Sequence, residues 1–227
     1  MSESLCRNIF LQIILALNDL HCNRFIAHRD LKPENMVFDS KTQTLKFIDF
    51  GTSCYDKKEG PDRKMHFVRH RQPKGSPMYM APENGPYSYP PKSNSLDLTY
   101  IGSQTDVYAC GITLFMMLCG FPPYSISIDG KEHRGRIMIR SGNFRQLMST
   151  YTVRLSEYAL DLLNGMLAPA ESRIETSQIL LHPWMRSVNY IAAVLQPSVP
   201  PPDGAAHTPG TNTDAPETAN APNNYLR

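Results

Sequence analysis

The hydrophobic positions near the start of the chain repeat with the period of an α-helix. Large apolar residues recur three or four positions apart, at Phe10, Ile13, Ile14, Leu17 and Leu20. This spacing places them on one helical face, and Ser2 or Ser4 would cap the first turn. The pattern predicts an amphipathic helix over about residues 4–21.

Three later segments predict further helices. The segment "TDVYACGITLFMML" (105–118) is almost wholly apolar, so a helix there must be buried on nearly every side. The segment "SEYALDLLNGML" (156–167) repeats its apolar residues helically behind a capping serine, Ser156. In "ETSQILLHPW" (175–184) a proline stops the helix.

Between the first two helices the pattern changes. The β-prone runs "MVF" (36–38) and "LKFI" (45–48) flank the polar "DSKTQT" and predict a small hairpin. Residues 51–95 are rich in Gly, Pro and charged residues without periodicity, which predicts loop with short helical pieces at most.

The residues from about 197 onward are rich in Pro, Ala, Thr and Asn and too poor in apolar groups to offset their ordering entropy. We therefore expect one folded unit over 1–190 and a disordered tail over 191–227.

Composition narrows the class of protein. The 227 residues are 41% apolar, enough for one sizeable core. The net charge of +2 is too small to indicate a nucleic-acid or membrane-surface partner, and no apolar run is long enough to span a bilayer. The five cysteines lack C-x-x-C spacing, which favours neither a disulfide framework nor a zinc site. The cysteines fit a reducing compartment, so we expect an intracellular protein, in the cytoplasm first and in the nucleus as the alternative.

Charged and polar residues are most concentrated in "HRDLKPEN" (28–35), which is followed by "DFG" (49–51). Further blocks are "GSPMYMAPE" (75–83), "TDVYACG" (105–111), "GFPPY" (120–124) and "RIETSQILLHPW" (173–184). These blocks occur in the order found in the eukaryotic protein kinases of serine/threonine type, and the resemblance covers about residues 1–188. Among these kinases they look most like the calcium/calmodulin-dependent group. The resemblance implies a mostly α fold, the C-terminal helical lobe of a kinase, with a small β-hairpin carrying the catalytic and metal-binding loops.

The resemblance also implies roles for individual residues in transfer of the γ-phosphoryl of ATP to protein hydroxyls. Asp30 would accept the proton of the hydroxyl, Lys32 would neutralise the transferring phosphoryl, and the Ser76 hydroxyl would bond to Asp30. Asn35 and Asp49 supply the oxygen ligands that Mg²⁺ prefers. The remaining nucleotide-site candidates are Val37 and Ile48, as the floor under adenine, and Glu34.

Two interpretations of Glu34 are equally supported. It contacts a basic residue near the acceptor of a protein substrate, or it is a solvated surface residue. Other matching positions are structural by resemblance. Glu83 and Arg173 would form a buried ion pair, Asp106 would anchor the backbone of the catalytic loop, and Gly51 lets the chain turn behind Asp49.

By resemblance, the residues from DFG (49–51) to APE (81–83) form the activation segment of a kinase. Arg29 marks the kinase type that commonly pairs this arginine with a phosphorylated residue of that segment, here near Gln72. No Ser, Thr or Tyr lies between Tyr55 and Ser76. We therefore expect that phosphorylation of the common kind does not switch this protein. The segment is longer than usual and basic, which fits either an acidic partner or, more often, a solvated run of charge.

The chain departs from the family in one large respect. Residues 1–227 contain no Gly-rich phosphate loop, no lysine on a third strand and no helix glutamate of an N-terminal β lobe, so we expect these residues to lack that lobe. We expect this chain alone to be inactive or nearly so, either as part of a longer kinase that supplies the upstream lobe or as a short pseudokinase. The alternative function is a non-catalytic, pseudokinase-like interaction module.

Overall fold

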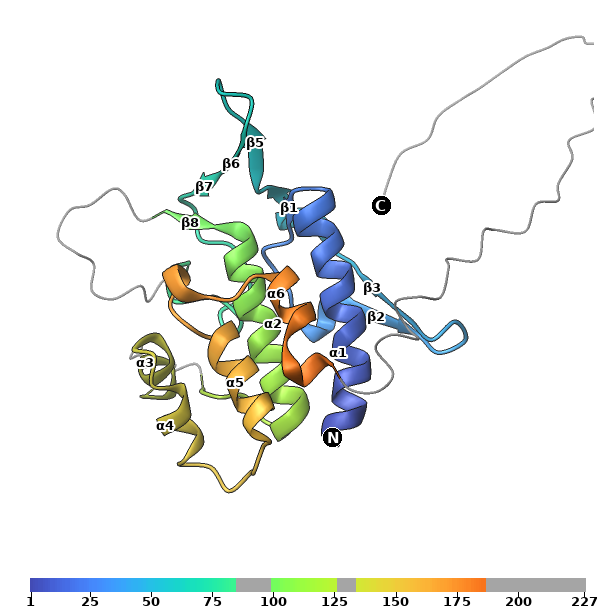
Figure 1. Ribbon diagram of the computed structural model, residues 1–227, viewed down its shortest axis with the longest axis vertical. Helices are drawn as coiled ribbons and strands as arrows, with labels where there is room; N and C mark the ends of the chain where they lie inside the picture. Colours follow the sequence, from blue (N-terminus) through green and yellow to red (C-terminus); the bar gives the residue numbers. More distant parts are fainter. Residues whose placement is uncertain (85–98, 126–133, 187–227) are drawn as a thin grey trace, which may run out of the picture.

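The computed structural model describes residues 1–84, 99–125 and 134–186, and over these ranges helices dominate, with two-stranded sheets at their edges (Figure 1). The α-helices are α1 (Glu3–Asn18), α2 (Gly102–Cys119), α3 (Arg134–Arg140), α4 (Phe144–Met148), α5 (Glu157–Met166) and α6 (Thr176–Leu181). A π-helical turn spans Asp19–Asn23. Short 3₁₀ turns lie at Pro33–Asn35, Phe50–Thr52, Ala170–Ser172 and Pro183–Met185.

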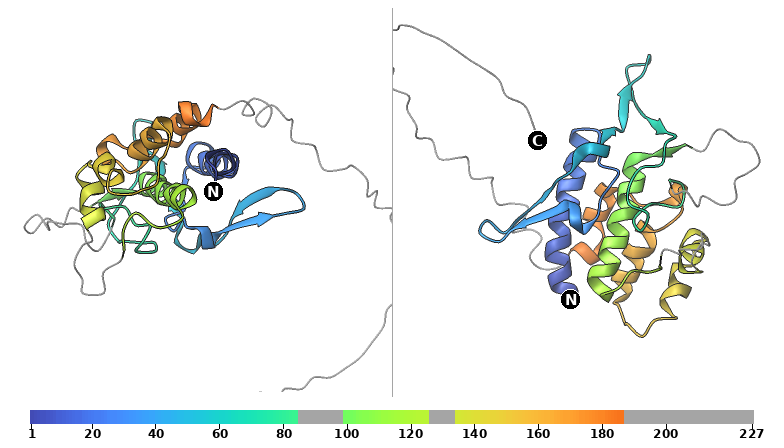
Figure 2. Two further views of the ribbon diagram at one scale, coloured as in Figure 1. Left: turned by 90° about the horizontal axis from the view of Figure 1, so that it is seen from below. Right: turned by 180° about the vertical axis from the view of Figure 1, so that it is seen from behind.

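The core lies between α1, α2 and α5. Helix α1 buries the predicted apolar face, and Ser2 caps it by accepting a hydrogen bond from the Leu5 amide. Helix α2 is buried along most of its length and contacts both α1 and α5, as its composition predicted. Gly120 ends α2 in a left-handed conformation (φ 84°), which glycine adopts without steric cost. The view along the helices in Figure 2 shows α2 beside α1.

The predicted hairpin is confirmed. Strands β2 (Met36–Asp39) and β3 (Thr44–Phe47) pair antiparallel, with Met36 opposite Phe47. The hairpin projects from the side of the helical body in Figures 1 and 2. Because Asn35 precedes β2 and Ile48 follows β3, the hairpin brings the two ends of the predicted metal site to one place; the Ile48 amide donates to the Asn35 carbonyl (3.0 Å).

The prediction of loop over residues 51–95 is wrong at four short strands in the described part, β4, β5, β6 and β7. Short antiparallel pairs occur there: β1 (Ile26–Ala27) with β4 (Cys54–Tyr55), β5 (Lys57–Glu59) with β6 (Met65–Phe67), and β7 (Arg69–His70) with β8 (Tyr100–Ile101). Strands of two or three residues are too short to show a periodicity. Two of these pairs also depend on partners from distant segments, which local sequence does not reveal.

The predicted tail, 191–227, and the segment 85–98 lie outside the described residues. In the part that the structure describes, no helix has the length and apolar character needed to cross a bilayer.

Candidate active site

A buried aspartate on α2 fixes the backbone before the catalytic loop. The Asp106 carboxylate accepts hydrogen bonds from the amides of His28 and Arg29, both at 2.7 Å, and contacts the His21 ring nitrogen at 2.9 Å. Arg29 has a positive φ of 65°, an uncommon conformation for a residue with a side chain. Two amide bonds to one buried carboxylate hold this conformation in place, which is the anchoring geometry expected for Asp106.

Asp30 lies at the centre of a network formed by the other polar residues of the loop. Its Oδ1 accepts hydrogen bonds from the Ser76 amide and hydroxyl, both at 2.8 Å. Its Oδ2 lies 3.0 Å from the Lys32 ammonium, which also donates to the Ser76 hydroxyl at 2.7 Å. Asn35 Nδ2 donates to the Asp30 carbonyl at 2.9 Å. The structure thus brings together Asp30, Lys32, Asn35 and Ser76, all four of which the sequence predicted as site residues.

This network sets the charge of Asp30. Partial burial by itself raises the pKa of the carboxyl, but the hydrogen bonds from Lys32 and from the Ser76 hydroxyl and amide outweigh burial. The pKa of Asp30 therefore lies below its ordinary value. A carboxylate that stays ionised at neutral pH, with an accepting oxygen near the surface, is suited to orient a hydroxyl and take up its proton.

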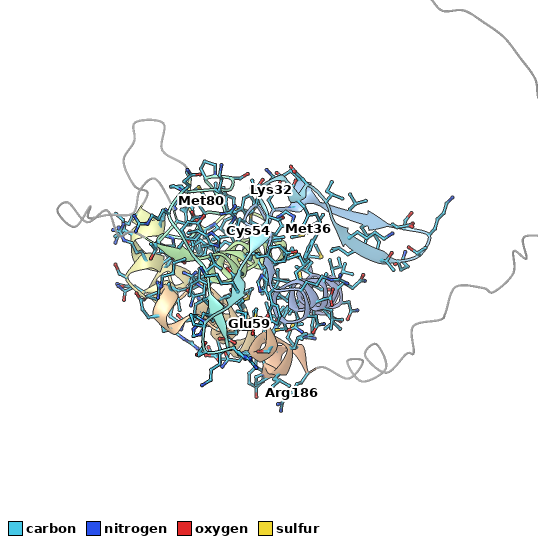
Figure 3. All side chains as sticks on the ribbon, turned by 90° about the horizontal axis from the view of Figure 1, so that it is seen from above. Lys32, Met36, Cys54, Glu59, Met80 and Arg186 are labelled. Carbon is cyan, nitrogen blue, oxygen red and sulfur yellow. The ribbon has the colours of Figure 1, made fainter. Side chains whose placement is uncertain are left out.

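Ser76 reaches Asp30 because the preceding residue is glycine. Gly75 has φ 112°, and a Cβ on it would lie 2.7 Å from the Arg29 carbonyl oxygen. A side chain at this position would therefore meet both backbone strain and a clash. This close approach joins the segment after β7 to the catalytic loop. Figure 3 shows Lys32 where the β2–β3 hairpin meets the helical body.

The predicted metal ligands lie at either end of the hairpin. Asn35 is buried and uses Nδ2 to bond to Asp30, so its amide oxygen is the atom left to bind a cation. Asp49 is exposed in a left-handed conformation (φ 60°), and its Oδ1 accepts a long hydrogen bond from the Gly51 amide (3.3 Å). One amide oxygen and one carboxylate fit the oxygen preference of Mg²⁺, which commonly binds through one or two protein ligands and substrate phosphates.

The described residues contain no cluster of three or more His, Cys, Asp or Glu side chains that would hold a metal by themselves. A cation at Asn35 and Asp49 would therefore need oxygens from a nucleotide. The predicted adenine floor is uncovered on this chain: Val37 is 48% exposed and Ile48 is 42% exposed. Glu34 is exposed as well.

Two predicted structural residues, Glu83 and Arg173, form an ion pair across 90 residues of sequence. The Arg173 side chain is fully buried, donates to both carboxylate oxygens of Glu83, and also donates to the Gln104 carbonyl at 2.8 Å. A bidentate arginine–carboxylate pair fixes the relative orientation of its two segments. The pair ties the end of the activation segment to the turn after α5.

Sequence reasoning missed the actual partners of Arg29. Its Nε donates to the Thr52 carbonyl at 2.7 Å and its Nη1 to the Tyr100 hydroxyl at 3.4 Å. A backbone carbonyl leaves no sequence signal, and Tyr100 lies outside every block of the resemblance. Only the folded chain reveals these contacts.

Comparisons with known proteins agree with this geometry. The sequence profile of the protein kinase domain matches residues 1–185. Calcium-dependent protein kinase 21 of Oryza sativa is 35% identical over 191 residues, which cover 83% of this chain and 29% of that kinase. Calcium-dependent protein kinase 32 of Arabidopsis thaliana is 34% identical over 166 residues, covering 71% of this chain and 26% of that kinase.

A human relative gives the same result. The phosphorylase b kinase gamma catalytic chain, liver/testis isoform, is 34% identical over 191 residues, covering 81% of this chain and 41% of the human chain. The chain thus spans less than half the length of each of these relatives. It belongs to the protein kinase family, among serine/threonine kinases that resemble the calcium-dependent kinases.

Proposed function

We propose that this chain is the C-terminal catalytic lobe of a serine/threonine kinase that transfers the γ-phosphoryl of Mg-ATP to hydroxyls of protein substrates. The observation that supports this most is the set of contacts around Asp30. One oxygen of its carboxylate is held by Ser76, and the other lies beside Lys32 and Asn35. A base fixed in this way beside a cation matches the two demands of phosphoryl transfer, orientation of the hydroxyl and neutralisation of charge.

In this proposal each residue has one task. Asp30 orients the substrate hydroxyl and accepts its proton, while the Lys32 ammonium stabilises charge on the phosphoryl group. Asn35 and Asp49 hold Mg²⁺, which when bound neutralises the phosphates. Val37 and Ile48 contact the adenine ring, and the exposed Glu34 favours substrates with a basic residue near the acceptor. The activity requires a surface that covers the half-exposed Val37 and Ile48, so residues 1–227 alone would transfer phosphoryl slowly or not at all.

The proposal is tested by the substitution Asp30→Asn in the protein as its native source produces it, hereafter the native protein, because residues 1–227 alone are expected to have little activity. We expect transfer of labelled phosphoryl from Mg-ATP to Ser/Thr peptides, and we expect D30N to lower kcat by about 10²- to 10⁴-fold, the usual contribution of a general base. Asp161→Asn is the matched control, because Asp161 is an exposed residue of α5. Equal kcat values for D30N and the unsubstituted protein would refute the role of Asp30.

A second candidate function is a non-catalytic interaction module. It is favoured by the exposed apolar side chains Val37, Phe38, Ile48 and Phe50, which lie on the hairpin and directly after it. Titration calorimetry of the native protein with Mg-ATP separates the two candidates. Binding that is lost in Asp49→Asn supports the enzyme, whereas no heat of binding together with no turnover supports the module.

A further inference from the structure

The Tyr100 side chain connects the catalytic loop to the late part of the activation segment. Tyr100 is 3% exposed and belongs to β8, which pairs with β7. Its hydroxyl donates to the Gln72 carbonyl at 2.7 Å and accepts a longer hydrogen bond from Arg29 Nη1 at 3.4 Å. Its ring lies 5.6 Å from the His70 ring. The hydroxyl therefore bridges two segments 43 residues apart, at the position where the resemblance placed a phosphorylated residue.

Arg29 holds both ends of the same segment through this bridge. Directly, its Nε donates to the Thr52 carbonyl at the start of the segment; indirectly, through Tyr100, it reaches Gln72 near the end. Within the described residues, no carboxylate forms an ion pair with Arg29. The arginine is thus satisfied by a carbonyl and a neutral hydroxyl where a phosphate would otherwise bind.

The middle of the segment is fixed independently. The buried Asp56 carboxylate accepts a hydrogen bond from the Gly102 amide at 2.8 Å, and the Asp56 backbone bonds to Phe25 and Val68. The stretch from Gln72 to Ser76 is held at two points before it reaches Asp30. The Tyr100 hydroxyl binds the Gln72 carbonyl, and the Asn84 side chain accepts from the Lys74 amide (3.3 Å) and donates to the Lys74 carbonyl (2.8 Å). Of these contacts, the Tyr100 hydroxyl is the one that links the stretch leading to Ser76 with Arg29, the residue next to Asp30.

We propose that Tyr100 is a positioning residue that holds the end of the activation segment against Arg29 through its hydroxyl, so that the segment is ordered without phosphorylation. Its effect on catalysis rests on the proposed kinase function. Its effect on the order of the activation segment does not rest on that function, because the hydrogen bonds of Tyr100 are present whether or not the protein transfers phosphoryl. The two can therefore be tested separately.

Tyr100→Phe removes the hydroxyl and keeps the ring against His70. The readout is limited trypsin digestion of the native protein, since Arg71 and Lys74 lie on either side of Gln72. Loss of one hydrogen bond should speed cleavage at these two sites by about two- to tenfold, because proteolysis follows the population of the locally opened state. Cleavage at Arg154, an exposed site between α4 and α5, should not change.

Two control variants sharpen the test. Gln72→Ala keeps the backbone carbonyl that Tyr100 binds and should be cleaved like the unsubstituted protein. Tyr158→Phe removes the hydroxyl of a tyrosine that is 61% exposed and should also have no effect. Unchanged cleavage of Y100F at Arg71 and Lys74 would overturn the proposal, as would equal acceleration at Arg154, which would indicate general loosening.

A kinetic measurement extends the test to function. If the native protein transfers phosphoryl as proposed, Y100F should raise the KM for a peptide substrate severalfold and leave the KM for ATP unchanged, because Ser76 borders the proposed base and not the adenine floor. Treatment of the unsubstituted protein with phosphatase should leave both values unchanged. If no variant transfers phosphoryl, the proposed function fails, and the trypsin digestion still decides the role of Tyr100.

Discussion

Ser76 orients the Asp30 carboxylate, which is the base in the proposed mechanism. The hydroxyl donates to Asp30 and accepts from Lys32, so it keeps base and cation in fixed relative positions. Burial raises the pKa of Asp30, whereas the hydrogen bonds from Lys32 and then from Ser76 lower it and outweigh burial. These contacts use only the hydroxyl group, which threonine also carries.

We expect Ser76→Ala to lower kcat/KM by about tenfold, the cost of one hydrogen bond to a charged group, and Ser76→Thr to retain most of the activity. Because the hydroxyl helps to lower the pKa of Asp30, S76A should raise that pKa. The acidic limb of the pH profile of kcat/KM should then move to higher pH, since Asp30 becomes protonated sooner on acidification. Ser177→Ala, on the exposed face of α6, serves as the control. An unshifted profile for S76A would contradict this assignment.

How much the sequence predicts at the site depends on the kind of contact. Asp30, Lys32, Asn35 and Ser76 lie in short blocks whose order matches the protein kinases, and the structure brings their side chains together. Tyr100 lies in no such block. Its contact with Gln72 uses a backbone carbonyl, for which any residue at position 72 would serve, so no residue type records it.

At the scale of secondary-structure elements, the Glu83–Arg173 pair joins two segments that are 90 residues apart in the sequence. Arg173 is completely buried, whereas the Glu83 side chain is 20% exposed. The arginine keeps two carbonyl partners, those of Gln104 and Ala168, when the carboxylate is removed. Neutral carbonyls do not compensate the charge, so an isolated guanidinium in this position is costly.

We expect Glu83→Ala to lower the free energy of unfolding by about 3 kcal/mol, the lower end of the range for breaking a buried pair. The matched control is Arg145→Ala, which breaks the exposed Arg145–Glu157 pair between α4 and α5 and should cost less than about 1 kcal/mol. Urea denaturation followed by circular dichroism measures both. Similar losses of unfolding free energy for the two variants would show that the buried pair stabilises the fold no more than the exposed pair does.

Helices and strands differed in how well the sequence predicted them. Helices α1 and α5 span ten residues or more and repeat their apolar positions, so periodicity identifies them. Helix α2 is apolar on nearly every side, so its length and composition identify it. Strands β4, β6 and β7 span two or three residues and are mainly exposed. Their pairing depends on hydrogen bonds to neighbours that tertiary structure supplies, and for that reason these strands were wrongly predicted as loop.

At the scale of the whole molecule, Glu3 connects the first helix to the end of the described chain. Its carboxylate accepts hydrogen bonds from the Ser156 amide and hydroxyl, both at 2.8 Å, and from the Trp184 indole at 3.1 Å. The Trp184 ring in turn packs edge-on against Phe10 of α1. One acidic side chain thereby joins α1, the cap of α5 and the turn that follows α6.

These contacts predict a pH dependence of stability. Burial raises the pKa of Glu3, but the hydrogen bonds from Ser156 and Trp184 together with the charge of Arg7 more than offset it, so the pKa is lower than in the unfolded chain. A group whose pKa is lower in the folded state stabilises the fold above its unfolded pKa. That stabilisation is lost as the pH falls through the folded pKa, where the carboxylate becomes protonated.

We therefore expect Glu3→Gln to reduce the free energy of unfolding at pH 7 by about 1 kcal/mol, because the amide cannot accept all three hydrogen bonds. At pH 3, below the pKa of Glu3 in the unfolded chain, the difference between E3Q and the unsubstituted protein should shrink, because protonation of Glu3 then favours the unfolded chain. Urea titrations at the two pH values test this, with the exposed Glu171→Gln as control. An equal difference at both pH values would mean that Glu3 acts through its shape alone, and that the ends of the described chain are held together by packing of Phe10 and Trp184 and not by charge.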